Sequence, residues 1–167
     1  MEVTVELIRT LRGQTGAGIL ECKQALQTSQ GDLEKAVEAL RHKGFAQVAK
    51  RANRATNQGL VEAYVHTGGR VGALVELGCE TDFVARTPEF KELAHDIAMQ
   101  IAAMAPAYLD KGDIKDGDSR PVAQVSLLQQ PFIKDGTTSV GEVVKELAAK
   151  MGENVRVLRF TRLALGE

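Results

Sequence analysis

Apolar residues recur at helical spacing in the first part of the chain. Residues 4–12 carry one apolar face, with Thr4 as the N-cap and Gly13 as the expected end of the helix. A second helix is expected to begin near residues 16–18, where two glycines precede another apolar face. The pattern at the start of the chain is therefore helical.

The third segment shows the clearest helical pattern. Asp32 is its expected N-cap, and Gly44 stands where a C-terminal glycine is expected. Apolar side chains follow the cap at positions i, i+3, i+4 and i+7, namely Leu33, Ala36, Val37 and Leu40. Three short helices joined by tight turns predict a miniature bundle over residues 1–45. The basic stretch that follows, residues 46–58, is expected to be a helical or extended linker.

The periodicity changes after the linker. Residues 60–66 and 71–77 are rich in Val, Leu and Tyr, and a glycine-bearing turn at 67–70 separates them. Two such runs with a short turn between them predict a β-hairpin.

A longer helix is expected after the hairpin. Thr87 and Pro88 mark its start, because proline is favoured at the first helical position, and its apolar spacing continues to Pro106. Residues 110–121 are polar and glycine-bearing, which predicts an exposed loop. The short apolar run at 125–128 predicts a third strand.

The last part of the chain predicts one more helix and one more strand. Ser139 and Glu142 form a capping box that opens a helix reaching Met151. Residues 154–165 alternate apolar with basic or polar side chains, which is typical of a strand with one wet face. The fold class predicted is α+β, with a three-helix bundle followed by a β-β-α-β-α-β core over residues 59–167 and a mainly antiparallel sheet.

The composition is that of an ordinary globular protein. The chain has 167 residues, of which 44% are apolar and 26% charged, and its net charge of −1 does not demand a nucleic-acid partner. Two cysteines make no disulfide framework, which favours a reducing compartment. The N-terminus is acidic and no apolar stretch is long enough to span a membrane, so the expected location is the cytoplasm, or the matrix or stroma of an organelle.

Residues that could carry catalysis or bind a metal are sparse. The histidines His42, His66 and His95 are not at metal-ligand spacing, so neither a metal nor a cofactor is expected. The glycines of residues 13–18 lack the Lys-Ser/Thr of a phosphate-binding loop and are better interpreted as helix punctuation. Cys79 could act as a nucleophile, but a small apolar residue at a strand end is the favoured interpretation.

Two segments stay open at this point. Residues 41–54 contain five Lys/Arg and no acid, so they could bind a phosphate backbone, although a solvated linker is favoured because Phe45 is their single aromatic residue and stacking needs several. Phe83 lies between polar residues at the expected strand-to-helix loop. Its ring is either a buried loop anchor or a contact for a partner, and the local sequence does not decide between them.

Four groups of motifs, in collinear order over nearly the whole chain, resemble elongation factor Ts. They are Leu11-Arg12 with the Thr15–Gly18, Cys22–Leu26, Gly31–Glu34 and Leu40–Gly44 segments, then Thr81–Ala85 (TDFVA), Leu128–Asp135 (LQQPFIKD), and Gly152-Glu153-Asn154 leading to Arg159-Phe160. One departure stands out, because only residues 110–124 join the core helix to the LQQPF segment, where this family usually carries a longer charged helical stretch.

The resemblance implies a ubiquitin-associated-like head, a linker and an α+β core, without enzymatic chemistry. It implies binding to the GTPase elongation factor Tu and acceleration of GDP release, with Asp82 and Phe83 inserted beside the nucleotide and magnesium site. The implied partner-binding residues are Gly16, Ala17, Gly18, Ile19 and Leu20 in the head and Thr81, Asp82, Phe83 and Val84 in the core. A homodimer through sheet edges near the C-terminal strand is also expected, and direct nucleic-acid binding is not.

Three rival functions remain at this stage. The head alone fits a ubiquitin-associated adaptor, and residues 41–54 fit an RNA-binding accessory protein of translation. The third rival is a thiol enzyme that uses Cys79.

Overall fold

The computed structural model describes residues 3–167 and begins with three helices, α1 (Val5–Thr15), α2 (Ile19–Thr28) and α3 (Leu33–Arg51). The two predicted N-caps are confirmed, because the side chains of Thr4 and Asp32 accept hydrogen bonds from backbone N–H groups of the first turn. The three helices enclose a buried cluster that includes Leu11 and Leu26. We call this unit, helices α1–α3, the head.

Two glycines predicted to end helices lie inside them instead. Helix α1 passes through Gly13 and ends at Gly16, whose φ of 68° is the left-handed conformation that glycine favours. Helix α3 passes through Gly44 and continues to Arg51, so the first half of the predicted linker is helical. A Cβ on Gly44 would lie 2.9 Å from the Cβ of Ala149. Glycine at this position therefore serves close helix packing rather than helix termination.

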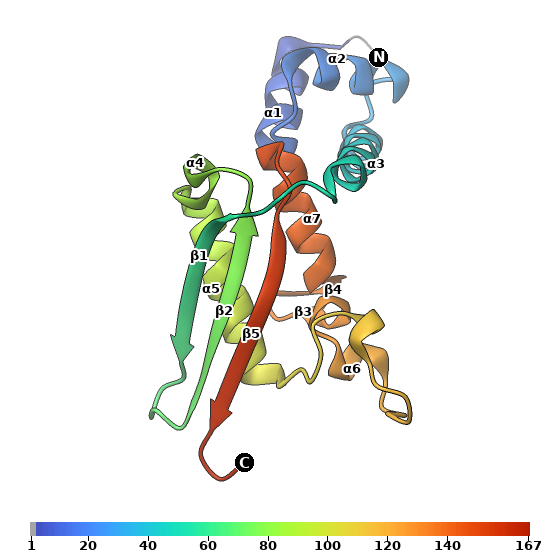
Figure 1. The fold of residues 1–167 in the computed structure, drawn as a ribbon. Helices are drawn as coiled ribbons and strands as arrows, with labels where there is room; N and C mark the ends of the chain where they lie inside the picture. Colours follow the sequence, from blue (N-terminus) through green and yellow to red (C-terminus); the bar gives the residue numbers. More distant parts are fainter. Residues whose placement is uncertain (1–2) are drawn as a thin grey trace.

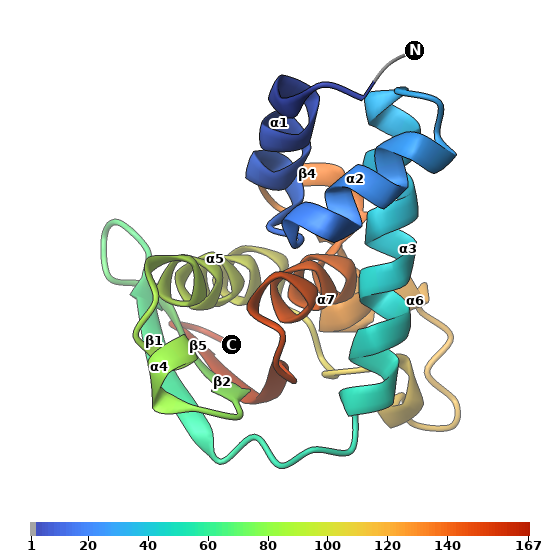
Figure 2. The same cartoon turned by 90° about the horizontal axis from the view of Figure 1, so that it is seen from above.

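The predicted hairpin and C-terminal strand are confirmed and form one antiparallel sheet. Its strands are β1 (Gln58–Val65), β2 (Val71–Cys79) and β5 (Arg156–Ala164), in the order β1-β2-β5. One face of the sheet is covered by helices, as Figures 1 and 2 show, and the other is left open to solvent. Strand β5 alternates in burial along its length, as a strand with one wet face should.

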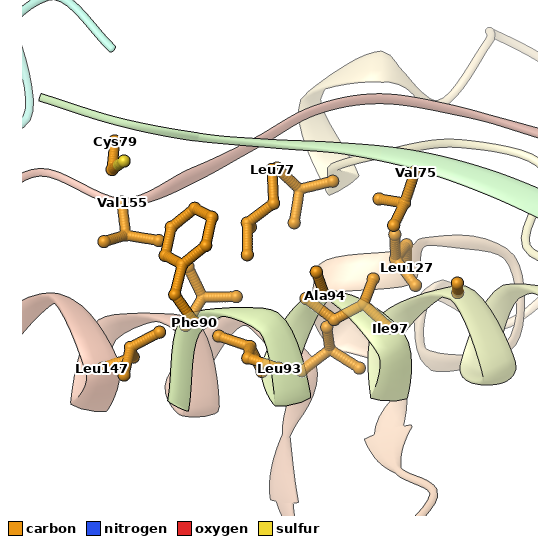
Figure 3. Packing of buried hydrophobic residues seen from close by; sticks show 14 of the residues in the cluster. Val75, Leu77, Cys79, Phe90, Leu93, Ala94, Ile97, Leu127, Leu147 and Val155 are labelled. Atoms are coloured by element: carbon orange, nitrogen blue, oxygen red, sulfur yellow. The ribbon is translucent and has the colours of Figure 1, made fainter. Parts of the chain in front are cut away.

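Two long helices cover the inner face of the sheet, α5 (Pro88–Met104) and α7 (Val140–Met151). Both N-terminal signals are confirmed, with Thr87 capping α5 ahead of Pro88 and the Ser139–Glu142 box capping α7. Figure 3 shows the core between these layers. Its fully buried side chains include Leu77, Phe90, Ile97, Leu127 and Val140.

The strand predicted at residues 125–128 is wrong. This stretch forms two helical turns, α6 (Val122–Val125) and η2 (Leu127–Gln129), and the following residues pair as short strands β3 (Pro131–Phe132) and β4 (Asp135–Ser139). A short apolar run cannot be assigned by periodicity alone, since a buried helical turn looks the same. The predicted loop before it contains one turn, η1 (Lys111–Asp113). The α+β fold class is confirmed.

Within residues 3–167, none of the helices has the length and apolarity needed to cross a membrane.

Candidate functional site

A single helical turn, α4 (Asp82–Ala85), follows directly after the end of β2. Thr81 caps this turn, with its hydroxyl accepting a hydrogen bond from the backbone N–H of Val84 at 3.4 Å. The turn divides its side chains between two directions: Val84 and Ala85 are buried in the core, whereas Phe83 is 79% exposed. The ring of Phe83 is therefore not a buried loop anchor, which was one of the two alternatives left open by the sequence.

The carboxylate of Asp82 lies beside this ring at the surface. Its Oδ2 atom is 2.8 Å from Nη2 of Arg86, one turn further along; the Arg86 side chain is largely exposed and that of Asp82 is about half exposed. An exposed ion pair of this kind contributes little stability, typically 0–1 kcal/mol. The Asp82–Phe83 pair is therefore an exposed aromatic ring and a carboxylate with only a weak local tie.

The predicted head residues form the turn between α1 and α2. Gly16 ends α1, Ala17 is half-buried against the head cluster, and Gly18 caps α2. Ile19 is 59% exposed and Leu20 is 74% exposed. Large aliphatic side chains placed side by side in water form an apolar patch suited to a protein contact.

Polar contacts hold this turn. The carboxylate of Glu21 accepts a hydrogen bond from the N–H of Gly18 and pairs with Lys43 of α3 at 2.9 Å. The ion pair with Lys43, followed by the bond from Gly18, lowers the pKa of Glu21 below its ordinary value. The turn that carries Ile19 is thereby tied to the rest of the head.

Helix α4 lies at the end of the sheet that is nearer to the head (Figure 1). Lys150 of α7 connects their surroundings: a Cβ on Gly16 would lie 3.0 Å from its Cγ, and its Nζ pairs with Glu89 in the first turn of α5 at 3.3 Å. A groove of about 560 Å³ lies between the head and helices α5 and α7. The groove is lined by apolar residues and by charged ones from the head and the core, among them Lys43, Glu89 and Lys150.

A network missed by the sequence analysis supports α4 from below. Glu153, in the loop after α7, accepts hydrogen bonds from Glu80 and Thr81, and Asn154 donates a backbone hydrogen bond to the carboxylate of Glu80. Both residues belong to the Gly-Glu-Asn motif, so the signal was present in the sequence. Its spatial relation to Thr81, more than seventy residues away, was not.

The residues considered for catalysis have structural partners. Cys79 is fully buried, its Sγ donates a hydrogen bond to the carbonyl of Thr81, and burial raises the pKa of the thiol. A raised pKa disfavours the thiolate that a nucleophile needs. His66 bonds to the hydroxyl of Tyr64. Across the described part of the chain, no group of three or more His, Cys, Asp or Glu is arranged to hold a metal ion.

The basic run at residues 41–54 is partly neutralised by ion pairs. Arg41 pairs with Glu146 of α7, and Arg54 pairs with Glu80. Lys43 pairs with Glu21, as described above. These contacts leave the run less positive than its sequence indicates, and the pair between Arg41 and Glu146 also connects the head to the core.

A small α+β protein with a helical head and two exposed apolar sites presents the kind of surface that protein-binding factors use. The comparisons with known proteins make this specific. Residues 15–119 match the family model of elongation factor Ts. The chain belongs to the elongation factor Ts family, whose members act in the elongation step of protein synthesis.

Curated relatives extend the match over the full chain. The elongation factor Ts of Thermotoga neapolitana is 47% identical, covering all of this chain and 99% of the relative. Those of Carboxydothermus hydrogenoformans and Coprothermobacter proteolyticus are 43% and 41% identical, covering 99% and 100% of this chain and 90% and 100% of the relatives. The alignment with the Thermotoga protein spans 195 positions against 167 residues here, a difference of 28. This chain is therefore a short member of the family.

Proposed function

We propose that this protein binds elongation factor Tu and promotes GDP release by inserting the Asp82–Phe83 pair beside the nucleotide and magnesium site of the GTPase. The observation that carries the proposal is the 79% exposure of Phe83 on a rigid turn with an accessible carboxylate next to it. A large ring held in water carries a hydration cost that insertion into a partner removes. The exposed Ile19 and Leu20 would supply a second contact on the same partner.

No chemical step is needed for this activity. If this protein lowers the affinity of Tu for GDP by a given ratio, GDP must lower the affinity of Tu for this protein by the same ratio, because the two binding equilibria are linked. The protein therefore needs only a better fit to empty Tu than to nucleotide-filled Tu. A buried aromatic anchor supplies about 2–4 kcal/mol of such preference. The function is that of an exchange factor and not of an enzyme, and its place of action is the cytoplasm, where elongation takes place.

The substitution Phe83→Ala tests the proposal. We expect it to keep the fold, because the ring makes no core contact, and to lower stimulated GDP release from cognate Tu by roughly 30–900-fold, the equivalent of about 2–4 kcal/mol. Release of a fluorescent GDP analogue measures the rate. Met104→Ala is the matched control, because Met104 is also exposed (48%) and lies at the far end of α5. Equal exchange rates for Phe83→Ala and the control variant would rule out the proposed role.

We also propose that the protein self-associates through β5. This strand is an edge of the sheet, and the outer face around it exposes Leu163, Leu74 and Val65. An edge strand with unpaired backbone groups beside an apolar face is suited to pairing with a second copy. Sedimentation should give a dimer for the wild type and a larger monomer fraction for Leu163→Asp. A wild-type protein that sediments as a monomer at all concentrations tested would refute this part.

A further inference from the structure

The carboxylate of Glu153 is the centre of a group of hydrogen bonds under α4. Its Oε2 accepts from the backbone N–H groups of Glu80 (3.2 Å) and Thr81 (3.0 Å), and its Oε1 accepts from the hydroxyl of Thr81 (2.6 Å). Three donors on one ionised group make strong, geometrically specific bonds. Residues 80–81 are therefore fixed by a side chain more than seventy positions away in the chain.

Helix α4 depends on such outside support. It has only four residues, and a single helical turn is unstable by itself because nucleation fixes several residues for very few internal bonds. Thr81 links the turn to Glu153, since its hydroxyl donates to the carboxylate and accepts from the N–H of Val84. The carboxylate of Glu153 thus orients both the capping hydroxyl of Thr81 and the backbone that leads into Asp82 and Phe83.

A second layer of contacts holds Glu153 in place. Asn154 is buried, donates its backbone N–H to Glu80 at 2.7 Å, and donates its side-chain amide to the carbonyls of Ala52 and Arg54. Arg54 closes the group with an ion pair to Glu80. Segments that follow α3, β2 and α7 therefore meet directly beneath α4. Since the group joins three separate segments, its geometry is not adjustable from α4 alone.

We propose that Glu153 is a positioning residue for nucleotide exchange, which holds the α4 turn so that Phe83 is presented outward in the orientation the partner receives. The inference rests on the proposed function of the Asp82–Phe83 pair and adds that this pair acts only when its support is intact. Glu153 itself is set back from the ring and acts through Thr81. The hydrogen bonds from Glu153 are already formed in the free protein, so the α4 turn does not lose conformational entropy when the partner binds.

The test is a double-substitution cycle on the rate of GDP release. Glu153→Gln keeps the shape of the side chain but replaces one acceptor oxygen with an NH2 group, which cannot accept from the backbone N–H groups of residues 80–81 or from the hydroxyl of Thr81, whichever of them it faces. We expect it to slow release at saturating factor by roughly tenfold, the scale of losing a hydrogen bond to a charged group. In the Phe83→Ala background, the same change should alter the rate by less than twofold, because there is no ring left to position. A purely structural role would not produce this dependence on Phe83.

Glu142→Gln is the matched control. Glu142 is also a carboxylate that accepts hydrogen bonds at the start of a helical turn, but it lies in the first turn of α7, whereas Glu153 follows the other end of that helix. The thermal midpoint of Glu142→Gln should fall by about as much as that of Glu153→Gln, while its rate of GDP exchange stays close to that of the wild type. Should Glu153→Gln fold poorly, Thr81→Val removes the hydroxyl that links the two residues, and the same cycle with Phe83→Ala applies.

Each outcome has one meaning. Wild-type exchange by Glu153→Gln, or a tenfold loss that persists in the Phe83→Ala background, overturns the positioning role and leaves the proposed function standing. Wild-type exchange by Phe83→Ala overturns the proposed function itself, whatever Glu153→Gln does. Equal losses of exchange rate in Glu153→Gln and Glu142→Gln would show that both variants act by lowering the stability of the protein, which also overturns the inference.

Discussion

The substitution Gly44→Ala tests two opposing effects: alanine is preferred over glycine inside a helix, but its methyl group would crowd the contact between α3 and α7. Gly44 lies within α3, where alanine is favoured over glycine by about 0.8–1 kcal/mol. Its added methyl group would, however, lie 2.9 Å from the Cβ of Ala149 on α7, closer than real Cβ contacts allow. Overpacking of this kind typically costs 1–3 kcal/mol. The net change expected is a loss of roughly 0–2 kcal/mol in the free energy of unfolding.

Gly13 provides the matched control. It lies within α1, and a Cβ added there meets no atom within 4 Å. Gly13→Ala should therefore raise the free energy of unfolding by about 0.5–1 kcal/mol, since only the helix preference changes. The expected difference between the two variants is roughly 1–3 kcal/mol, all of it due to the approach of α3 to α7.

Urea unfolding followed by circular dichroism at 222 nm measures both variants, because the chain has no Trp for fluorescence. The double variant Gly44→Ala, Ala149→Gly should recover part of the loss, because it returns the space to the other helix. Stabilisation of Gly44→Ala equal to that of Gly13→Ala would refute the reasoning, since it would mean that α3 and α7 are not in close contact.

Two further predictions follow from the head and from the support of α4. Changing Ile19 and Leu20 together to Asp should weaken Tu binding in a titration without lowering the thermal midpoint appreciably, because both side chains are exposed. The hydrogen bond from Asn154, and then the pair with Arg54, lowers the pKa of Glu80. The free energy of unfolding gained from this lowered pKa is present above the unfolded pKa of about 4.3 and is lost as the pH falls through the folded value. The difference in free energy of unfolding between the wild type and Glu80→Gln should therefore be constant near pH 7 and shrink below about pH 4.3.

Local signals predicted the elements well where they were self-contained. Thr4, Asp32, Thr87 and Ser139 cap helices as predicted, because a cap depends on residues within one turn. The prediction that Gly44 ends a helix was wrong, because glycine is needed there for the close approach of Ala149 on α7, about a hundred residues away. A sequence pattern reports what a segment prefers alone, and close helix contacts override that preference.

The site divides in the same way. The motif around Phe83 drew attention to this turn, but the sequence left the direction of the ring undecided, since exposure depends on how the turn packs on the core. Val84, predicted as a partner contact, is buried and anchors the turn. Glu153 was visible as part of a motif, but its contact with Thr81 arises only when the end of α7 is brought beneath β2.

Helix α7 and the loop after it provide a common reference for both exposed apolar sites. The head rests on α7 through the close contact at Gly44, through the pair between Arg41 and Glu146, and through Lys150 beneath Gly16. The α4 turn rests on Glu153, just after the same helix. Screening the exposed ion pair removes at most about 1 kcal/mol, whereas an added methyl group at Gly44 costs up to about 3 kcal/mol, so this contact is more sensitive to a steric change than to the loss of the charge pair. High salt should therefore change the spacing between the head patch and Phe83 less than a single methyl group at Gly44 does.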